Sequence, residues 1–168
     1  MASQSVVNFM KQQGFPEEAP VTCGAHFTGL NFQPKILGTL VVVGIILRSP
    51  ILFLVLSAAL WWSVLVPALN PFEAFYNRVI AAPRGKPLLV PAPAPRRFAQ
   101  GMAGTMMLIV GFALLEGWTT TAWVFEAMIV VAILALLFGR FCAGAYVYHL
   151  LRGKISFANA TLPWSGSR

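Results

Sequence analysis

The 168-residue sequence has few of the side chains that carry enzyme chemistry. It contains no aspartate and only two histidines and two cysteines, and 10% of its residues are charged. The sequence therefore offers no paired carboxylates, no glycine-rich phosphate loop and no nucleophile beside a general base. Two histidines and two cysteines at these spacings match no metal-ligand pattern that we recognise. We expect a chain that is not an enzyme and that holds neither a metal nor a cofactor.

From the first residues we expect no cleavable signal peptide. No basic segment there is followed directly by an apolar core, and the first apolar run begins only near Pro34. We expect the apolar helices themselves to direct insertion into the membrane.

Apolar residues dominate what is present. They make up 58% of the sequence, and the mean hydropathy is +0.74. Four apolar stretches can be distinguished, at Pro34–Leu47, Ile51–Leu69, Phe98–Leu115 and Trp118–Gly139. The sequence predicts an all-α, polytopic membrane protein in which four transmembrane helices form two hairpins, with short interfacial helices beside them.

The basic residues divide unequally between the two sides of this predicted membrane. Only Arg48 falls on the side of the two hairpin turns. The other eleven share the side of both termini: Lys11, Lys35, Arg78, Arg84, Lys86, Arg96, Arg97, Arg140, Arg152, Lys154 and Arg168. Basic loops resist translocation, so the sequence predicts a bacterial inner-membrane protein with both termini in the cytoplasm. Anionic lipid headgroups are the expected partner of these charges, and we expect no nucleic-acid binding.

The chain divides into three parts. Residues 1–33 form a cytoplasmic leader, in which the spacing of Val6, Phe9, Met10 and Gln13 predicts a surface helix. Residues 34–152 form the membrane domain, with a proline-rich loop over 79–97 and an interfacial helix over Asn70–Arg78. The fourth span is predicted to run on as helix through Phe141–Leu151. Residues 153–168 form a polar cytoplasmic tail.

The first span is short. Ile36–Leu47 supplies twelve uncharged residues, whereas a bilayer core needs about twenty. Extension back through Phe27–Phe32 adds the missing length, with Lys35 reaching the interface along its apolar stem.

The two halves of the membrane domain share a pattern. Phe32, Gly38 and Thr39 have the same internal spacing as Phe98, Gly104 and Thr105. Two spans in each half would make a parallel internal repeat, related by an axis along the membrane normal.

Two kinds of ionisable side chain, a glutamate and the two histidines, are functional candidates. Glu126 is the only acid inside a predicted span. It is either a proton or ion site or, as we prefer, a protonated or hydrogen-bonded acid near the outer headgroups or one that contacts a neighbouring subunit. His26 and His149 lie outside the spans, where solvated or headgroup-contacting histidines are expected rather than haem or pigment ligands. Any lipid or pigment contacts would then be peripheral.

Small and aromatic residues have a clearer physical role. Small residues let helices approach closely in lipid, and we expect this role for Gly101, Gly104, Gly111, Ala132, Ala135 and Gly139. Aromatic residues favour the membrane interfaces. The sequence places Phe72, Phe75, Tyr76, Phe141, Tyr146 and Tyr148 at the inner interface, and Trp118 and Trp123 at the outer one.

Two short motifs carry a family resemblance. Pro95–Gln100 precedes the third span and Phe141–Tyr148 follows the fourth. Over about Leu30–Arg152 the chain resembles an uncharacterised bacterial family of small four-helix membrane proteins, known only as a domain of unknown function. That family has a proline-rich loop, an Arg-Phe-x-Gln motif and an ending of the form Phe-Cys-x-Gly-Cys-x-x-Tyr. The resemblance implies thiol or sulfur chemistry at a Cys-x-x-Cys pair. Here Ala145 replaces the second cysteine, so Cys142 is expected to be a packing residue.

Three functions follow from these observations. The first is a non-catalytic accessory subunit of a larger membrane assembly, for which a respiratory or photosynthetic complex is a natural host. The second is a membrane thiol-redox or sulfur-handling protein that uses Cys142 together with Cys23. A small transporter is the third and has the least support, because one intramembrane acid makes a poor polar pathway.

Overall fold

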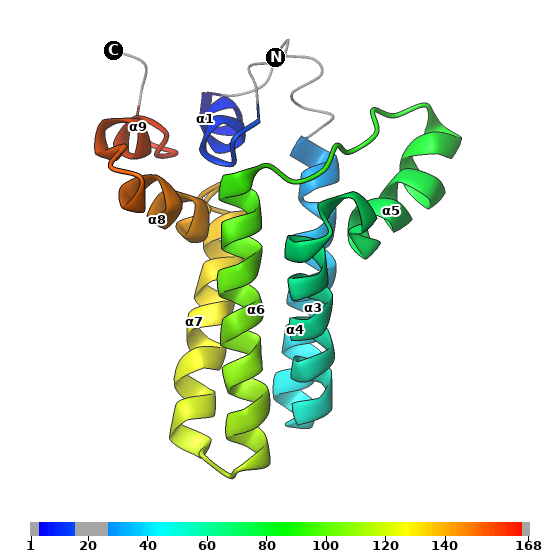
Figure 1. Ribbon diagram of the computed structural model, residues 1–168, viewed down its shortest axis with the longest axis vertical. Coiled ribbons are helices and arrows are strands. Elements are labelled where there is room, and N and C mark those ends of the chain that lie inside the picture. Colours follow the sequence, from blue (N-terminus) through cyan, green and yellow to red (C-terminus); the bar gives the residue numbers. More distant parts are fainter. Residues whose placement is uncertain (1–3, 16–26, 166–168) are drawn as a thin grey trace.

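A computed structural model describes residues 4–15 and 27–165, and over these residues the chain is entirely helical (Figure 1). Four helices stand side by side: α3 (Phe32–Leu47), α4 (Pro50–Leu65), α6 (Ala94–Leu115) and α7 (Thr119–Leu137). The smaller helices are α1 (Gln4–Gln12), α5 (Pro71–Phe75), α8 (Ala143–Leu151) and α9 (Ile155–Ala160). Three-residue 3₁₀ segments cover Pro67–Leu69 and Ala82–Arg84, and a π-helical segment covers Tyr76–Ala81.

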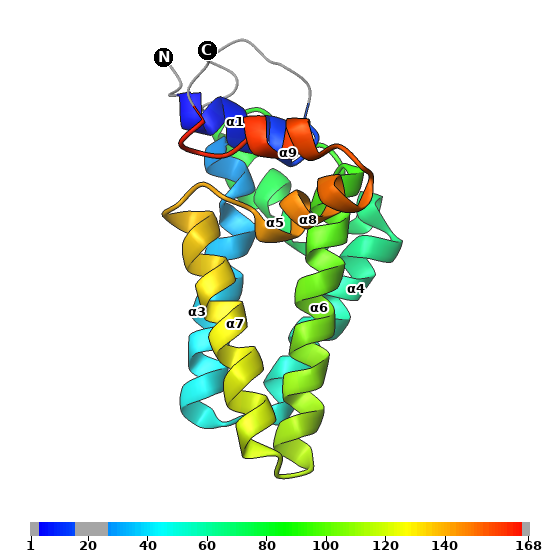
Figure 2. The same cartoon turned by 90° about the vertical axis from the view of Figure 1, so that its left-hand side faces the viewer.

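The smaller helices gather at one end of the four long ones. Helices α1, α5, α8 and α9 lie at the end where the described chain starts and finishes, here called the terminal end (Figures 1 and 2). The α3–α4 and α6–α7 turns lie at the opposite, turn end. Among the described residues, three segments are long and apolar enough to cross a membrane, namely Phe27–Leu47, Ala94–Leu115 and Thr119–Leu137. The first includes the predicted extension through Phe27–Phe32, and α4 is a shorter apolar helix.

Local sequence explains both turns. Arg48 has a left-handed backbone (φ 47°), and its N–H and that of Ser49 donate back to the carbonyls of Ile45 and Gly44. The Ser49 side chain then accepts from the N–H of Leu52, which caps α4 at its start. At the second turn Gly117 supplies a positive φ of 73°, a conformation that costs glycine little.

Two predicted helix ends are wrong for reasons of backbone chemistry. The second apolar helix was predicted to reach Leu69, but α4 ends at Leu65, because Pro67 has no N–H to continue the ladder. The third was predicted to begin at Phe98, but α6 begins at Ala94. Proline is tolerated in a first helical turn, so Pro95 does not prevent this earlier start.

The predicted continuous helix from the fourth span through Phe141–Leu151 is also wrong. Helix α7 ends at Leu137, and Arg140 adopts a left-handed backbone (φ 50°) before α8 begins at Ala143. The Phe141 N–H donates to the carbonyl of Ala135, which closes this turn. A Cβ on Gly139 would lie 2.6 Å from the same carbonyl oxygen, so a side chain there would force the turn open.

The closest contact between long helices joins α4 and α6. A Cβ on Gly104 would meet Trp61 at 3.1 Å and Leu60 at 3.3 Å, and a Cβ on Gly111 would meet Leu54 at 2.7 Å. Ser57 donates a hydrogen bond of 2.8 Å to the carbonyl of Gly104 across this contact. These two glycines therefore let α6 lie directly against α4.

Helices α1, α8 and α9 pack together at the terminal end of the bundle (Figure 2). Asn8 of α1 donates to the carbonyls of Leu162 and Ser165, which follow α9. The Phe9 ring is buried against Cys142 and Ala145. We call α1, α8 and α9 together the cap.

The α4–α6 contact can be tested with a matched pair of glycines. Gly104→Leu should lower the stability of the protein in detergent by about 1–3 kcal/mol, because the new side chain overlaps α4. Gly101→Leu should cost much less, since a Cβ there meets only Val64, at 3.8 Å. Thermal unfolding of the two purified variants measures the difference. Equal losses would contradict the packing described.

Candidate functional site

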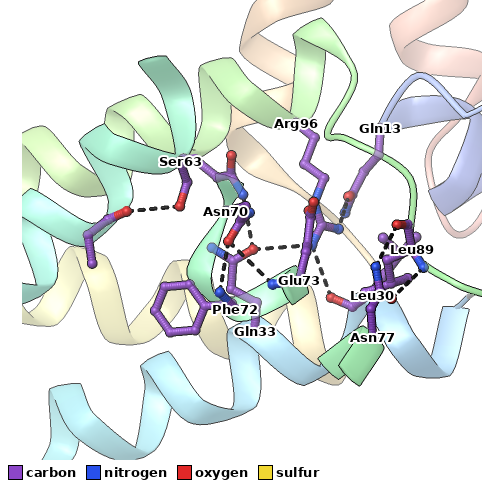
Figure 3. Close-up of polar contacts among 12 residues, drawn as sticks. Gln13, Leu30, Gln33, Ser63, Asn70, Phe72, Glu73, Asn77, Leu89 and Arg96 are labelled. Carbon is purple, nitrogen blue, oxygen red and sulfur yellow. Dashed lines mark hydrogen bonds and ion pairs between the residues drawn. The ribbon is translucent and has the colours of Figure 1, made fainter. Parts of the chain in front are cut away.

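Arg96 lies at the centre of a buried polar cluster near the start of α6 (Figure 3). Its guanidinium donates to the Gln13 side chain at 2.9 Å, and to the Leu30 carbonyl and the Gln33 side chain at 3.3 Å each. Gln100, one turn further along α6, donates to the same Gln33 oxygen at 3.0 Å. One arginine thus connects the segment after α1 with the start of α3.

Glu73 joins this cluster from α5. The Asn70 side chain accepts from the N–H groups of Phe72 and Glu73, which caps α5 and fixes its start (Figure 3). The Glu73 carboxylate then lies 3.9 Å from Nε of Arg96, an ion-pair distance that is too long for a hydrogen bond. Burial raises the pKa of Glu73 above its usual 4.5, and the Arg96 charge lowers it again only in part.

The cluster retains unused hydrogen-bonding capacity. Oε1 of Glu73, Nε of Arg96 and Oε1 of Gln100 are buried and have no hydrogen-bond partner among the described residues. Buried polar atoms of this kind are costly, about 1–3 kcal/mol each, unless a further partner reaches them.

A cavity of about 150 Å³ adjoins the cluster. Gln13, Gln33, Arg96, Gln100 and Cys142 form its polar end, and the remaining walls are almost wholly apolar. Those walls come from all four long helices and include Leu37, Leu60, Met102, Met106, Met107, Ile129 and Ile133. The site is therefore a small apolar space closed at one end by a buried guanidinium and amides.

Cys142 lies between α7 and α8 and is 4% exposed. Its backbone N–H donates to the Gln12 side chain at 2.9 Å. Burial raises the pKa of its thiol, and the N–H groups of Ala145 and Gly144 and the charge of Arg96 offset that rise only in part. Ala145, at the position of the family's second cysteine, is fully buried. Cys23 and His26 lie outside the described residues.

His149 differs from its expected solvated position. It is 6% exposed and sits in the cap, where Nε2 lies 2.9 Å from the carbonyl oxygen of Gln12. The rings of Tyr148 and Phe157 contact it on either side. The turn that ends α7 directs α8 across the terminal end, and this path buries the histidine.

Glu126 lies toward the turn end, opposite the Arg96 cluster. It is 1% exposed and forms an ion pair of 3.4 Å with Arg48, whose guanidinium also covers the Trp123 ring at 4.9 Å. The acid is thus hydrogen-bonded near the outer turn, next to exposed Trp118 and Trp123. Within the described residues no group of three His, Cys, Asp or Glu side chains could hold a metal ion.

The candidate small residues occupy several environments. Gly104 and Gly111 contact α4, whereas Ala132 lines the cavity and Gly101 faces an outer groove. Gly139 is exposed in the turn after α7, and Ala135 supplies the carbonyl that closes this turn.

The candidate aromatic residues gather in ring clusters at the terminal end. Phe75 and Tyr76 contact Phe32, and Tyr148 contacts Phe98. Phe141 contacts Tyr146 at 5.6 Å, and Phe72 is half-buried beside Glu73.

Sequence reasoning missed the Arg96 cluster. It treated Arg96 as one of eleven basic interface residues and placed it in the loop over 79–97. The available signal was the arginine and glutamine of the Pro95–Gln100 motif, which lie one helical turn apart once α6 is extended back to Ala94. Gln13 and Gln33 carried no comparable signal, because their partner is remote in sequence.

Comparison with known proteins identifies one family. The family model described as "Domain of unknown function (DUF4395)" matches residues 28–153. No curated protein and no solved structure matches the chain. The matched range contains Arg96, Gln100 and Cys142, and it ends just after α8.

The raised pKa of Glu73 predicts a pH dependence of stability. The native state holds the Glu73 proton more tightly than the unfolded chain does, so this contribution is fully present below pH 4.5 and is lost as pH rises through the native pKa. As pH rises from 4.5 through the native pKa of Glu73, the free energy of unfolding of the wild type in detergent should therefore fall relative to that of the Glu73→Gln variant. Chemical unfolding at several pH values measures it. Glu116→Gln, at an exposed turn position, is the control and should follow the wild type. If Glu73→Gln also followed it, the buried carboxyl would not be the source.

Proposed function

This chain belongs to the DUF4395 family, and from its fold and polar contacts we propose that it is a non-catalytic membrane protein that serves as an accessory subunit of a larger membrane assembly. In this proposal residues 34–152 form the membrane domain and cross the bilayer of a bacterial inner membrane four times, as two hairpins. Residues 1–33 and 153–168 then lie in the cytoplasm.

One observation supports the non-catalytic role above all: the buried ionisable side chains form ion pairs and hydrogen bonds with other groups of the same chain. Glu126 pairs with Arg48, and Arg96 is held by amides and by Glu73. His149 is hydrogen-bonded to α1 within the cap. Each of these groups contacts its own chain, so each has a structural role that needs no substrate.

Helix α4 supports the fourth crossing. Its 16 residues rise by about 24 Å, and Pro67–Leu69 extends the uncharged segment further. Because the α3–α4 and α6–α7 turns lie at the same end, α4 runs beside α6 from one end of the bundle to the other (Figure 1). Both helical hairpins would then cross a similar thickness of the bilayer.

The basic residues support the orientation. Arg48 is at the turn end, whereas Arg78, Arg84 and Lys86 follow α5 at the terminal end. Positively charged flanks stay in the cytoplasm, which would place the cap inside the cell.

Equivalent contacts in the two halves support a parallel repeat. Phe32 contacts Tyr76 at 5.3 Å, and its counterpart Phe98 contacts Tyr148 at 5.7 Å. Thr39 and Thr105 each donate to the carbonyl four residues earlier, at 3.0 and 2.9 Å. In both halves an aromatic residue near the start of the first helix thus packs on the segment after the second helix.

The outer face of α7 supports an assembly partner. In the most apolar 18 residues of α7, only 17% of the residues are buried inside the structure. The corresponding share is 33% in each of the other two candidate spans. Large side chains on this face are exposed, among them Trp123, Val131 and Phe138. Since Gly104 and Gly111 of α6 already serve the contact with α4, the exposed face of α7 is where we place a neighbouring subunit. A respiratory or photosynthetic complex remains the natural host in our proposal.

The thiol-redox and transporter alternatives have less support. The Cys142 thiol is buried with a raised pKa, which disfavours the reactive thiolate. The pairing of Glu126 with Arg48 occupies the one acid that a transport pathway could have used.

Native electrophoresis tests the accessory role. After mild detergent extraction from its own host, the tagged chain should migrate with other membrane proteins in a larger complex. Val131→Trp, on the exposed face of α7, should reduce that association at least severalfold by disturbing the contact surface. Val55→Trp, equally exposed on α4, is the matched control and should leave it intact. Migration of the wild type only as a free monomer or a small homo-oligomer would reject the accessory role.

A further inference from the structure

The cavity beside Arg96 has the size of a single ring. It measures about 150 Å³, and an apolar cavity of about this volume accommodates a benzene molecule. It lies where the four long helices approach the cap, with α3 and α7 on one side and α4 and α6 on the other (Figure 2). Its walls include Met102, Met106 and Met107, and methionine sulfur makes favourable contacts with aromatic rings.

The polar end of the cavity calls for a group that both donates and accepts hydrogen bonds. Arg96 and Gln100, 5% and 7% exposed, line this end. Nε of Arg96 lies 3.9 Å from the Glu73 carboxylate and has no hydrogen-bond acceptor, and Oε1 of Gln100 is an acceptor without a donor. A ring hydroxyl can satisfy both kinds of atom, since it donates one hydrogen bond and accepts others. A carboxylate could serve only the arginine.

A second space adjoins the cavity on the outer side of α6. This groove, of about 700 Å³, is lined largely by apolar and aromatic side chains, including Trp61, Phe98 and Phe125. Met102 and Met106 line both the groove and the cavity, so these two side chains form the wall between them. Methionine is flexible and unbranched, which lets such a wall change shape around a ligand.

From these two spaces we propose that the protein binds a membrane quinol, an isoprenoid lipid with a hydroxylated ring. The ring occupies the cavity with its hydroxyl groups toward Arg96 and Gln100, and the isoprenoid tail passes Met102 and Met106 into the outer groove. Binding uses the interior of one chain, so it goes beyond the accessory role and does not depend on an assembly partner.

Titration of the purified full-length chain with decylubiquinol, kept reduced, tests this inference. Binding can be followed by tryptophan fluorescence, because Trp61 lines the groove, and its stoichiometry by native mass spectrometry. The wild type should bind one decylubiquinol saturably, and lauric acid should not displace it. Gln100→Leu, which removes the acceptor and keeps the apolar volume, should weaken binding by about fivefold.

Two further variants separate occupation of the cavity from general adhesion to apolar surface. Ala132→Phe places a ring in the cavity and should weaken binding at least tenfold, whereas Val131→Phe adds the same ring to the exposed face of α7 and should bind as the wild type does. Circular dichroism establishes that each variant is folded. The proposal is overturned if the wild type shows no saturable binding, if lauric acid competes equally, or if folded Gln100→Leu binds like the wild type.

Discussion

One constraint shapes the structure: a charged side chain that is buried in the apolar helix bundle needs an oppositely charged partner. Both such pairs lie toward an end of the bundle. Arg48 and Glu126 form an ion pair toward the turn end, and Arg96 and Glu73 form one at the terminal end. Between these pairs the long helices present uncharged side chains, and Phe27–Leu47, α6 and α7 are each long and apolar enough to cross a membrane. A charge left unpaired at such depth is costly, so each pair restricts how its helices can slide along one another.

At the terminal end, the same requirement joins remote parts of the chain. The Arg96 guanidinium needs several oxygen atoms, and it takes them from the Gln13 side chain, from Leu30 and Gln33 at the start of the α3 segment, and from Glu73. Removing one partner of a buried pair typically costs about 3–5 kcal/mol. The cap is therefore fastened to the bundle by hydrogen bonds as well as by the apolar contacts of Phe9. Arg96 and Gln100 each keep a polar atom without a hydrogen-bond partner, and both line the ring-sized cavity, where we place a ligand.

The features that could be predicted from the sequence are those set by residues close together in the chain. The helices and their turns follow from hydropathy and from Arg48-Ser49-Pro50 and Gly117, whose effects act within a few residues. Glu126 was expected to be hydrogen-bonded near the outer side, and the single basic residue on that side could have suggested Arg48 as its partner. The position of His149 could not be read in this way, because it depends on the left-handed turn at Arg140. The Arg96 cluster was missed because its partners come from the segment after α1, from the start of the α3 segment and from α5. No periodic pattern links segments so far apart.

Cysteine labelling of intact cells tests the proposed two-hairpin crossing most directly. In a chain without Cys23 and Cys142, Glu116→Cys places a thiol at the α6–α7 turn, and Lys86→Cys places one in the loop before α6; both positions are exposed. A membrane-impermeant maleimide should label Glu116→Cys in intact cells and should reach Lys86→Cys only after the membrane is opened. Labelling of Lys86→Cys in intact cells, with Glu116→Cys protected, would contradict the orientation. Equal labelling of both positions would contradict the crossing itself.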